Sequence, residues 1–492
     1  MAPPCHIACD SVWARLTAPP DATELVREAL TVDDPAAKYT RAAQIGRWDG
    51  KQRFFQRPSN RFLAGLRWRV QEILETHGYV VTVDDAAPPP RDPLAPRLLR
   101  SSLRPYQEKA VEAVMAQGRA TLQSATGSGK TVIATEIVRR LGYPALWIVP
   151  RRKLMTQTAD VIRDELGIPV GMIGDGIRTD GPVIVAVINS LVSGGEAGLP
   201  PRTVLIVDEV HHAPSETWAQ VIQASVARVR IGLSGTAETR TPNPVRAMRL
   251  EGLLGPVIRA EDTMTLVSQG FLANPRVTFL APSPESYPLY SEIREIVLPD
   301  WRRDPKRLVK MGAKLFDETE RLGIVENDAR NRLLLNMAYR HVVKANDRVL
   351  ILCHTIPHSE RLTGTWRQTV RSHPVWRVDG KTPLKELDLI MRRFRDGSGG
   401  GLLVATPFFR EGIDIPEIDA LILAGGGMSE IVSIQSIGRA LRPRPDKQEV
   451  MIYDCWDGRR SAVGKERERD YLADHADARL RTYHDQKFEV TR

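Results

Sequence analysis

Cysteine and long hydrophobic segments are both scarce in this sequence. Only four of its 492 residues are cysteines, and they are too few and too scattered for a disulfide framework, so a reducing compartment is expected. The longest apolar runs, such as PVIVAVI at 182–188, are far shorter than the roughly 20 residues that a membrane span needs. The first residues, MAPPCHIACD, lack the basic start and apolar stretch of a signal peptide. We therefore expect a soluble, cytoplasmic protein.

Acidic residues are also outnumbered. The 69 lysines and arginines against 60 aspartates and glutamates give a formal net charge of +9. This excess favours an anionic partner such as nucleic acid but does not bear on the fold, and a merely basic protein is the alternative. Cys5, His6 and Cys9 lie close together, but no second ligand pair follows at zinc-finger spacing, so a structural zinc site there stays an open alternative.

The proline-rich stretch DDAAPPPRDPLAP at 84–96 predicts a semi-rigid linker, which we place at 85–97, after an N-terminal domain at 1–84. Beyond it, short apolar runs alternate with helical segments, a rhythm typical of parallel sheets buried on both faces. The predicted strands form two series, first ALWIVP, PVIVAVI, TVLIVDE and VRIGLSG, then RVLILCHT, VWRVDG, GLLVATP, ALILAGG and EVMIYDC.

These series predict an α/β fold of two tandem parallel-sheet domains, at 98–260 and 261–460, preceded by a small α+β domain. The segment at 461–492 mixes charges densely and predicts an exposed charged helical tail. The stretch 285–330 gives no clear prediction.

The segment QSATGSGKT at 123–131 stands between a strand-like run and a helical one, which is the context of a phosphate-binding loop. Its glycines let successive backbone N–H groups point at phosphate oxygens, and the next helix adds its positive end. Lys130 would neutralise the phosphates, and the Thr131 hydroxyl would ligate Mg²⁺. The predicted nucleotide-binding residues of this loop are Thr126, Gly127, Ser128, Gly129, Lys130 and Thr131.

The segment LIVDEVHHAP at 205–214 ends an apolar strand with two acids and two histidines. It allows either a metal cage or the acidic end of a nucleotide-hydrolysing strand. The acids lie on a strand and the HExxH spacing is absent, which favours the second interpretation. Asp208 would then hold the Mg²⁺ of a bound nucleotide, and Glu209 would orient or deprotonate the attacking water.

ATGSGKT followed by DEVH resembles the DExH-type helicases and translocases of superfamily 2, and further blocks agree in order over about 350 residues. They are LRPYQ at 103–107, IVPRRKLMTQ at 148–157, LSGTA at 233–237, LLVATPFFREGIDIPEID at 402–419 and SIQSIGRALRPRP at 433–445. The resemblance implies two RecA-like domains with ATP, and its Mg²⁺, bound between them.

The resemblance also implies roles for individual residues. Arg104 and Gln107 would recognise the adenine, while Gly412 and Asp414 would contact the nucleotide from the second domain. Gln435, Arg439 and Arg442 would act in catalysis, the two arginines as arginine fingers. His211, Ser234 and Thr236 would couple hydrolysis to movement, with Ser234, Thr236 or Gln435 as the neighbours of His211. Arg151, Arg152 and Thr406 would contact DNA, and His212 has no role.

The stretch 38–69 holds nine basic residues and interleaved aromatic residues, with Asp49 as its only acid. Cations meet phosphates and aromatic rings stack on bases, although most of these rings are expected in the core of so small a domain. The predicted DNA contacts are Arg47, Trp48, Lys51 and Arg53. The pattern GRWDGKQRFF…RFLAGLRWR resembles the N-terminal domain of the UvsW group of phage recombination and repair helicases.

That resemblance implies a DNA enzyme of a bacterial or phage-infected cell that remodels branched structures by fork regression, branch migration, or R-loop or D-loop unwinding. A single-strand-binding or recombination protein is a candidate further partner. An RNA-directed helicase and a duplex-DNA translocase subunit of a restriction or defence complex stay open as alternatives. A DNA-binding clamp with an inactive nucleotide site is disfavoured by the intact Lys130, Asp208 and Glu209.

Overall fold

A computed structural model of the chain describes all but several short segments. The described residues are 4–85, 88, 91–192, 199–235, 243–301, 308–396, 399–406, 418–427, 437–438, 441, 448–459 and 470–492. The chain divides into two compact units, one of residues 1–125 and 129–261 and the other of residues 126–128 and 262–492. Each unit is built around a parallel sheet.

The N-terminal part of the first unit is a four-stranded sheet with two helices. The strand order is β5-β2-β1-β6, with β1 antiparallel to β2 and parallel to β6. The elements are β1 (Pro4–Cys9), β2 (Trp13–Thr17), α1 (Pro20–Ala29), β5 (Arg61–Leu63), α3 (Arg67–Thr76) and β6 (Val80–Asp84). Cys5 is 1 % exposed in the apolar core that these elements share, beside Ile7 and Phe62. This is the predicted small α+β domain.

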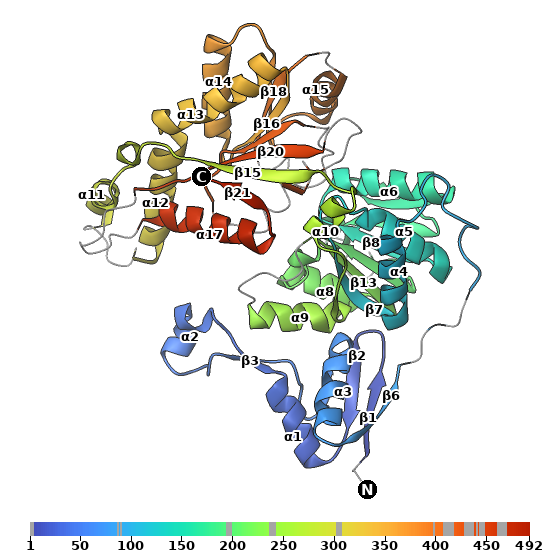
Figure 1. The fold of residues 1–492 in the computed structure, drawn as a ribbon. Helices are drawn as coiled ribbons and strands as arrows, with labels where there is room; N and C mark the ends of the chain where they lie inside the picture. The colour runs from blue at the N-terminus through green and yellow to red at the C-terminus, as the bar shows by residue number, and fades with distance from the viewer. Residues whose placement is uncertain are drawn as a thin grey trace. The chain divides into compact units, whose positions relative to one another are not determined.

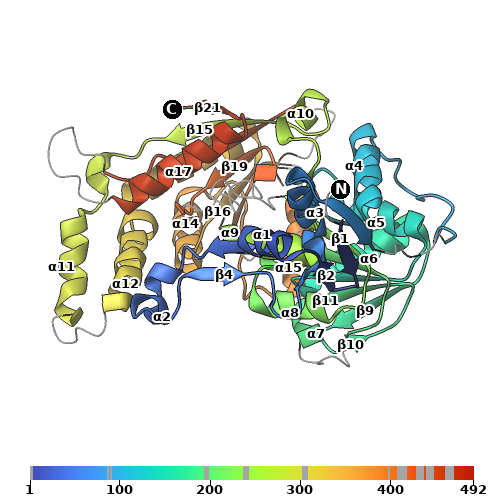
Figure 2. The same cartoon turned by 90° about the horizontal axis from the view of Figure 1, so that it is seen from below.

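An arm leaves this domain after α1 (Figures 1 and 2). Its stem is the antiparallel pair β3 (Thr31–Asp33) and β4 (Lys51–Arg53), and its outer part holds the short helix α2 (Arg41–Gln44). Many side chains of the arm are exposed, including Arg47, Lys51 and Ile45, the last at 53 %. The arm therefore adds surface rather than core to the domain.

The rest of the first unit is an eight-stranded sheet of order β10-β9-β11-β8-β12-β13-β7-β14, parallel except for β10. The strands are β7 (Arg119–Gln123), β8 (Ala145–Val149), β9 (Val170–Gly174), β10 (Ile177–Arg178), β11 (Val183–Val187), β12 (Val204–Asp208), β13 (Val229–Ser234) and β14 (Val257–Arg259). All four predicted strands of this series are confirmed. β8, β11 and β12 are buried along their whole length, as expected for strands covered on both faces.

Helices pack on both faces of this eight-stranded sheet. One apolar core joins alternate strand residues to α4 (Pro105–Gln117), α5 (Lys130–Leu141) and α6 (Arg152–Leu166). A second joins the other face to α7 (Ile188–Val192), α8 (Glu216–Ala224) and α9 (Pro244–Leu254). Leu63 of the N-terminal domain belongs to this second core, so the domain and the sheet share apolar packing.

The predicted semi-rigid linker at 85–97 is partly wrong. The backbone N–H of Leu94 donates to the carbonyl of Arg139 at 3.0 Å, and the Arg139 guanidinium donates to the carbonyl of Ala95 at 2.9 Å. Arg91 lies over the ring of Tyr143 at 4.9 Å. The residues from 91 onward are thus packed on α5 and the turn after it, because these contacts satisfy their polar backbone groups.

The second unit holds a seven-stranded parallel sheet of order β17-β18-β16-β19-β20-β15-β21. The strands are β15 (Asn274–Leu280), β16 (Arg348–Leu352), β17 (Val375–Val378), β18 (Gly401–Ala405), β19 (Ala420–Leu423), β20 (Glu449–Cys455) and β21 (Glu489–Thr491). The five predicted strands are confirmed, and β15 and β21 were not predicted. Two α/β units with large parallel sheets are the predicted fold class.

The helices of this unit are α10 (Thr263–Ser268), α11 (Tyr290–Trp301), α12 (Leu308–Glu320), α13 (Asp328–Tyr339), α14 (Ile356–Thr369), α15 (Leu384–Asp396) and α17 (Tyr471–Asp485). The stretch 285–330, which gave no prediction, supplies α11 and α12. None of the described helices combines the length and the apolar character of a membrane span.

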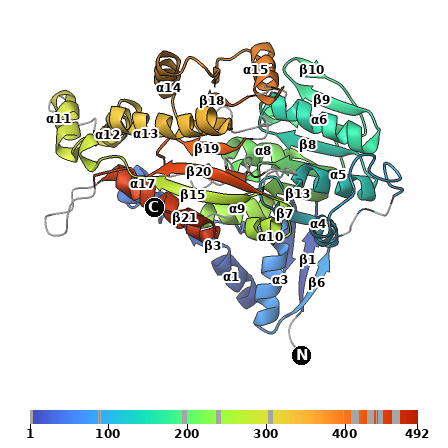
Figure 3. The same cartoon turned by 45° about the horizontal axis from the view of Figure 1, so that its top comes forward.

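The predicted exposed tail at 461–492 is wrong where the structure describes it. Helix α17 lies beside β15, β20 and β21 (Figure 3) and buries an apolar stripe at Leu472, Ala476, Leu480 and Tyr483. The prediction took charged residues as exposed. Arg479 is instead 3 % exposed and is paired with the buried carboxylates of Asp454 and Asp457.

Candidate nucleotide site and nucleic-acid surface

The predicted phosphate-binding loop connects β7 to α5. Gly129 immediately precedes the first turn of α5 at φ 82°, a left-handed conformation that favours glycine. The Lys130 ammonium donates to the carbonyls of Ser124 and Ala125, each at 3.3 Å. The N-terminal end of a twelve-residue helix and a lysine therefore meet in one loop, which suits phosphate binding.

The predicted acids stand at the end of β12. Asp208 is 7 % exposed, and its Oδ1 accepts the backbone N–H of Glu209 at 2.9 Å. Glu209 has φ 50° and ψ 53°, so the chain turns sharply in the left-handed region directly after the strand. A non-glycine residue held in this region marks local strain of the kind that gathers at functional sites.

Strand pairing brings these segments to one edge of the sheet. β13 lies between β12 and β7, with Leu233 opposite Asp208 and Ser234 opposite Gln123. The backbone N–H of Ser124 donates to the carbonyl of Ser234 at 3.0 Å. The phosphate loop, the acids and the start of the coupling block thus follow the carboxyl ends of three adjacent parallel strands, where α/β sheets bind ligands.

Gln107 connects the predicted adenine-binding block to this loop. Its Oε1 accepts the backbone N–H of Arg104 at 2.9 Å, and the side chain is 6 % exposed. A Cβ built on Gly129 would lie 2.5 Å from Gln107 Nε2, so the Gln107 amide lies directly against the loop. Lys130, Thr131 and Asp208 offer the ammonium, hydroxyl and carboxylate that a magnesium nucleotide requires, and the site fits that ligand.

The two histidines after the acids have separate surroundings. His211 Nδ1 lies 3.4 Å from Glu209 Oε2 without forming a hydrogen bond. The His212 ring stacks on Trp218 with 5.6 Å between ring centroids, which is a structural contact that the sequence did not reveal. Within the described residues no three His, Cys, Asp or Glu side chains gather as a metal cluster.

Several predicted residues lie outside the described residues: Thr236, Gly412, Asp414, Gln435, Arg439 and Arg442. Among the described ones, Ser234 is fully buried at the end of β13. Thr406 follows β18 and is 4 % exposed, which does not favour its predicted DNA contact. Arg151 is the N-cap residue of α6, and the exposed Arg152 forms an ion pair with Asp175.

The basic stretch at 38–69 separates into paired and unpaired cations. Five of its arginines pair with acids as follows: Arg53 with Asp49, Arg57 with Glu24, Arg61 with Asp10, Arg67 with Asp85 and Arg69 with Glu251. Within the described residues, Arg47 and Lys51 on the arm have no ion-pair partner, and the half-buried Trp48 donates from Nε1 to the carbonyl of Lys51 at 3.0 Å. Phe55 and Phe62 belong to the core, as expected for most of the aromatic residues.

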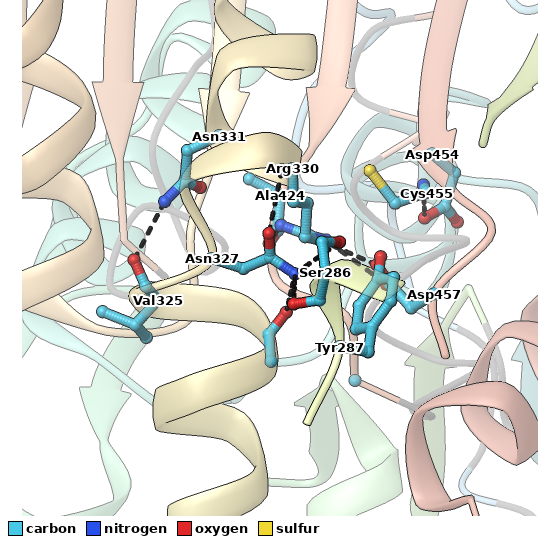
Figure 4. A network of polar contacts seen from close by, with 12 residues as sticks. Ser286, Tyr287, Val325, Asn327, Arg330, Asn331, Ala424, Asp454, Cys455 and Asp457 are labelled. Carbon is cyan, nitrogen blue, oxygen red and sulfur yellow. Dashed lines mark hydrogen bonds and ion pairs between the residues drawn. The ribbon is translucent and has the colours of Figure 1, made fainter. Parts of the chain in front are cut away.

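Sequence reasoning missed a buried ionic network in the second unit (Figure 4). Arg330 and Asp457 are both 0 % exposed and pair at 2.7 Å, and Arg479 pairs with Asp457 at 3.1 Å. Burial alone would raise the pKa of Asp457, but the charges of Arg330 and Arg479 hold it below its ordinary value. The two acids, Asp454 near the end of β20 and Asp457 just after it, were the available signal.

Two arginines of this network donate to the backbone that precedes the predicted SIQSIGRALRPRP block at 433–445. Arg330 Nη1 donates to the carbonyl of Ala424 at 2.9 Å, and Arg479 Nη1 donates to the carbonyl of Gly427 at 3.0 Å. A Cβ on Gly427 would lie 2.2 Å from the His354 ring. The segment 424–427 is therefore held by the two buried arginines and by contact with His354.

Comparison with known families finds two matching family models. The family model described as "Type III restriction enzyme, res subunit" matches residues 100–239, and that described as "Helicase conserved C-terminal domain" matches residues 330–444. The first range contains the phosphate loop and the DEVH acids, and the second contains the predicted arginine fingers. The chain is a superfamily 2 helicase. Its activity is ATP-driven, and it resembles the UvsW group.

Individual relatives cover most of the chain. "DNA 3'-5' translocase XPB2" of Sulfurisphaera tokodaii is 28 % identical over 71 % of this chain and 80 % of its own length. "ATP-dependent DNA helicase uvsW" of Enterobacteria phage T4 is 23 % identical over 94 % of this chain and 93 % of its own length. The solved DNA-bound "ATP-dependent Type ISP restriction-modification enzyme LlaBIII" shares the fold at 16 % identity and TM-score 0.54, over 78 % of this chain and 30 % of that chain.

Proposed function

We propose that this helicase is a DNA enzyme that remodels branched DNA, by fork regression, branch migration, or R-loop or D-loop unwinding. The observation that carries the proposal is the match to a phage DNA helicase over 94 % of the chain, which is more than the two motor domains span. The nucleotide edge formed by β7, β13 and β12 supplies the motor that such an activity requires.

In this proposal the residues of that edge divide the work of ATP hydrolysis. Lys130 neutralises the phosphate oxygens, and Thr131 and Asp208 would hold Mg²⁺, which when bound offsets further phosphate charge. Glu209 orients the attacking water and accepts its proton. Arg104 and Gln107 bind the base, and His211, Ser234 and Thr236 relay the state of the site. By the family resemblance, Gln435, Arg439 and Arg442 would act in catalysis, and Gly412 and Asp414 would contact the nucleotide.

The arm is the proposed contact for nucleic acid outside the motor. Arg47 and Lys51 carry exposed charge without an acidic partner in the described residues, and Trp48 offers a half-exposed ring for stacking. Arg53 shares its charge with Asp49 and contributes less. Arg151 and Arg152, at the start of α6, are the proposed contacts within the motor. A single-strand-binding or recombination protein is a proposed partner.

A substrate panel tests this proposal. The full chain is assayed for ATP hydrolysis and strand separation on forked DNA, Holliday junctions, R-loops, linear duplex DNA and RNA duplexes. We expect the strongest stimulation with branched DNA. Stronger stimulation by structured RNA would contradict the proposal and support an RNA-directed helicase.

A second candidate is a duplex-DNA translocase of a restriction complex. The match of residues 100–239 to a restriction-enzyme subunit favours it. The two candidates differ in product, because a translocase displaces a third strand from a DNA triplex without separating the duplex. Triplex displacement without any unwinding of forks or junctions would favour this second candidate.

A further inference from the structure

Helix α9 contacts the segment that follows the catalytic acids. Arg246 Nη2 donates to the carbonyl of His211 at 2.9 Å, and Arg249 Nη1 donates to the carbonyl of Pro214 at 3.0 Å. Between these carbonyls the chain completes the short turn that begins at Glu209. Two arginines of one helix therefore hold the backbone directly after the residue that handles the attacking water.

The same helix is packed into the N-terminal domain. Met248 is 7 % exposed and belongs to that domain's apolar core. The Glu251 carboxylate accepts from Arg69 Nε at 3.1 Å and from Arg69 Nη2 at 2.6 Å. Figure 1 shows α9 on the side of the eight-stranded sheet next to the N-terminal strands. One helix thus contacts both the DEVH segment and the N-terminal domain.

The contact is close at the level of the backbone. A Cβ built on Gly65 would lie 2.1 Å from the carbonyl oxygen of Glu251, and a Cβ on Gly252 would lie 2.8 Å from Leu63 Cδ1. Arg119, the first residue of β7, adds a second anchor by donating to the carbonyls of Asp10 at 2.8 Å and Ser11 at 3.0 Å. At these backbone contacts there is no gap to absorb a displacement, so one part can transmit it to the other.

We propose that Arg246 and Arg249 are positioning residues for Glu209, and that α9 couples the nucleotide edge formed by β7, β13 and β12 to the N-terminal domain. The coupling to DNA rests on the proposed function, in which that domain binds DNA. DNA bound at the N-terminal domain then changes the rate of hydrolysis through α9. If bound DNA also changes the affinity for nucleotide, nucleotide binding changes the affinity for DNA by the same factor.

The Arg69–Glu251 pair allows a test in the full-length chain. We compare Arg69→Glu, Glu251→Arg and the double variant for ATP hydrolysis with and without saturating forked DNA. The single variants change net charge in opposite directions, but both break the pair. We expect both to keep the DNA-free rate and to lose DNA stimulation several-fold, and the double variant to regain it.

Two outcomes overturn the proposal. Full DNA stimulation in both single variants would show that the pair does not couple the parts. Loss in Arg69→Glu alone, without recovery in the double variant, would show that Arg69 acts only through its charge toward DNA. Absence of DNA stimulation in the unmodified protein would instead contradict the proposed function, so the two failures are distinguishable.

Two further comparisons test the positioning role. Arg249→Ala should lower kcat for ATP with little change in KM, and Arg249→Lys should recover part of kcat by restoring a donor to the Pro214 carbonyl. A raised KM, or a lysine variant no better than alanine, would contradict positioning. Gly65→Ala should separate the domain from α9 and reduce DNA stimulation, while Gly364→Ala, whose new methyl meets no atom within 4 Å beyond its chain neighbours and its own helix backbone, should not. Equal stimulation in these two variants would overturn the coupling.

Discussion

The buried network of the second unit predicts a large loss of stability from one small substitution. Asp457→Asn keeps the shape of the side chain but removes the carboxylate that faces Arg330 and Arg479. All three side chains are buried, with at most 3 % of their surface exposed. Arg479 keeps Asp454 as a partner, whereas Arg330 keeps only a neutral acceptor, the Ala424 carbonyl, among the described residues. Removing one partner of a buried ion pair costs about 3–5 kcal/mol, because the remaining charge stays buried without compensation.

For a unit of this size each kcal/mol corresponds to about 2–4 °C in Tm, so the expected fall is about 6–20 °C. The assay is thermal unfolding of the full chain, with Asp328→Asn as the matched control. Asp328 pairs with Arg361 on the surface, where both side chains are more than 40 % exposed, and its loss should cost about 1 kcal/mol or less. Equal Tm values for the two variants would refute the reasoning.

Three further predictions concern pH, salt and the phosphate loop. Burial lowers the pKa of His358 from 6.5 to about 3, so the neutral ring stabilises the fold fully above pH 6.5 and progressively less as pH falls toward 3. In urea titrations, His358→Gln should therefore show a smaller change in the free energy of unfolding between pH 6.5 and pH 3. An unchanged pH profile would contradict this. Arg47→Ala and Lys51→Ala should each lower the slope of log DNA affinity against log salt by about 1 if they meet phosphates, and an unchanged slope would show a merely solvated face. Gly129→Ala would place a Cβ 2.5 Å from Gln107 Nε2 on a residue with φ 82°. Because a left-handed non-glycine residue costs about 1–2 kcal/mol, the loop conformation that binds ATP becomes less populated, and KM for ATP should rise about tenfold. An unchanged KM would contradict the account.

Point substitutions serve the salt experiment better than deletion of residues 1–84. That deletion would uncover Met248, Gly252 and the apolar face of α9, because the N-terminal domain shares its core with the motor sheet. A change in DNA binding would then be hard to separate from unfolding.

The motor edge was predictable because its signals are local. Each of β8, β11, β12 and β13 is a short apolar run between helical segments, and the glycine-rich loop stands directly before its helix. β21 escaped prediction because it is three residues long and pairs only at the sheet edge with β15. A three-residue strand has too few alternations to show a period.

Contacts between distant residues could not be predicted. Asp457 is 127 residues from Arg330, and Glu251 is 182 residues from Arg69. An arginine in a sequence therefore gives no sign of whether it will face DNA, as predicted for the stretch 38–69, or a carboxylate of the same chain. The tail helix shows the same limit, since the acids that permit the burial of Arg479 lie in and just after β20.

The central claim is that ATP hydrolysis at Lys130 drives the remodelling of branched DNA. The most direct measurement compares the unmodified chain with Lys130→Ala for fork unwinding and DNA-stimulated ATP hydrolysis under the same conditions. We expect the unmodified chain to do both, and Lys130→Ala to lose both while still binding the fork. DNA-stimulated hydrolysis that survives in Lys130→Ala would contradict the account.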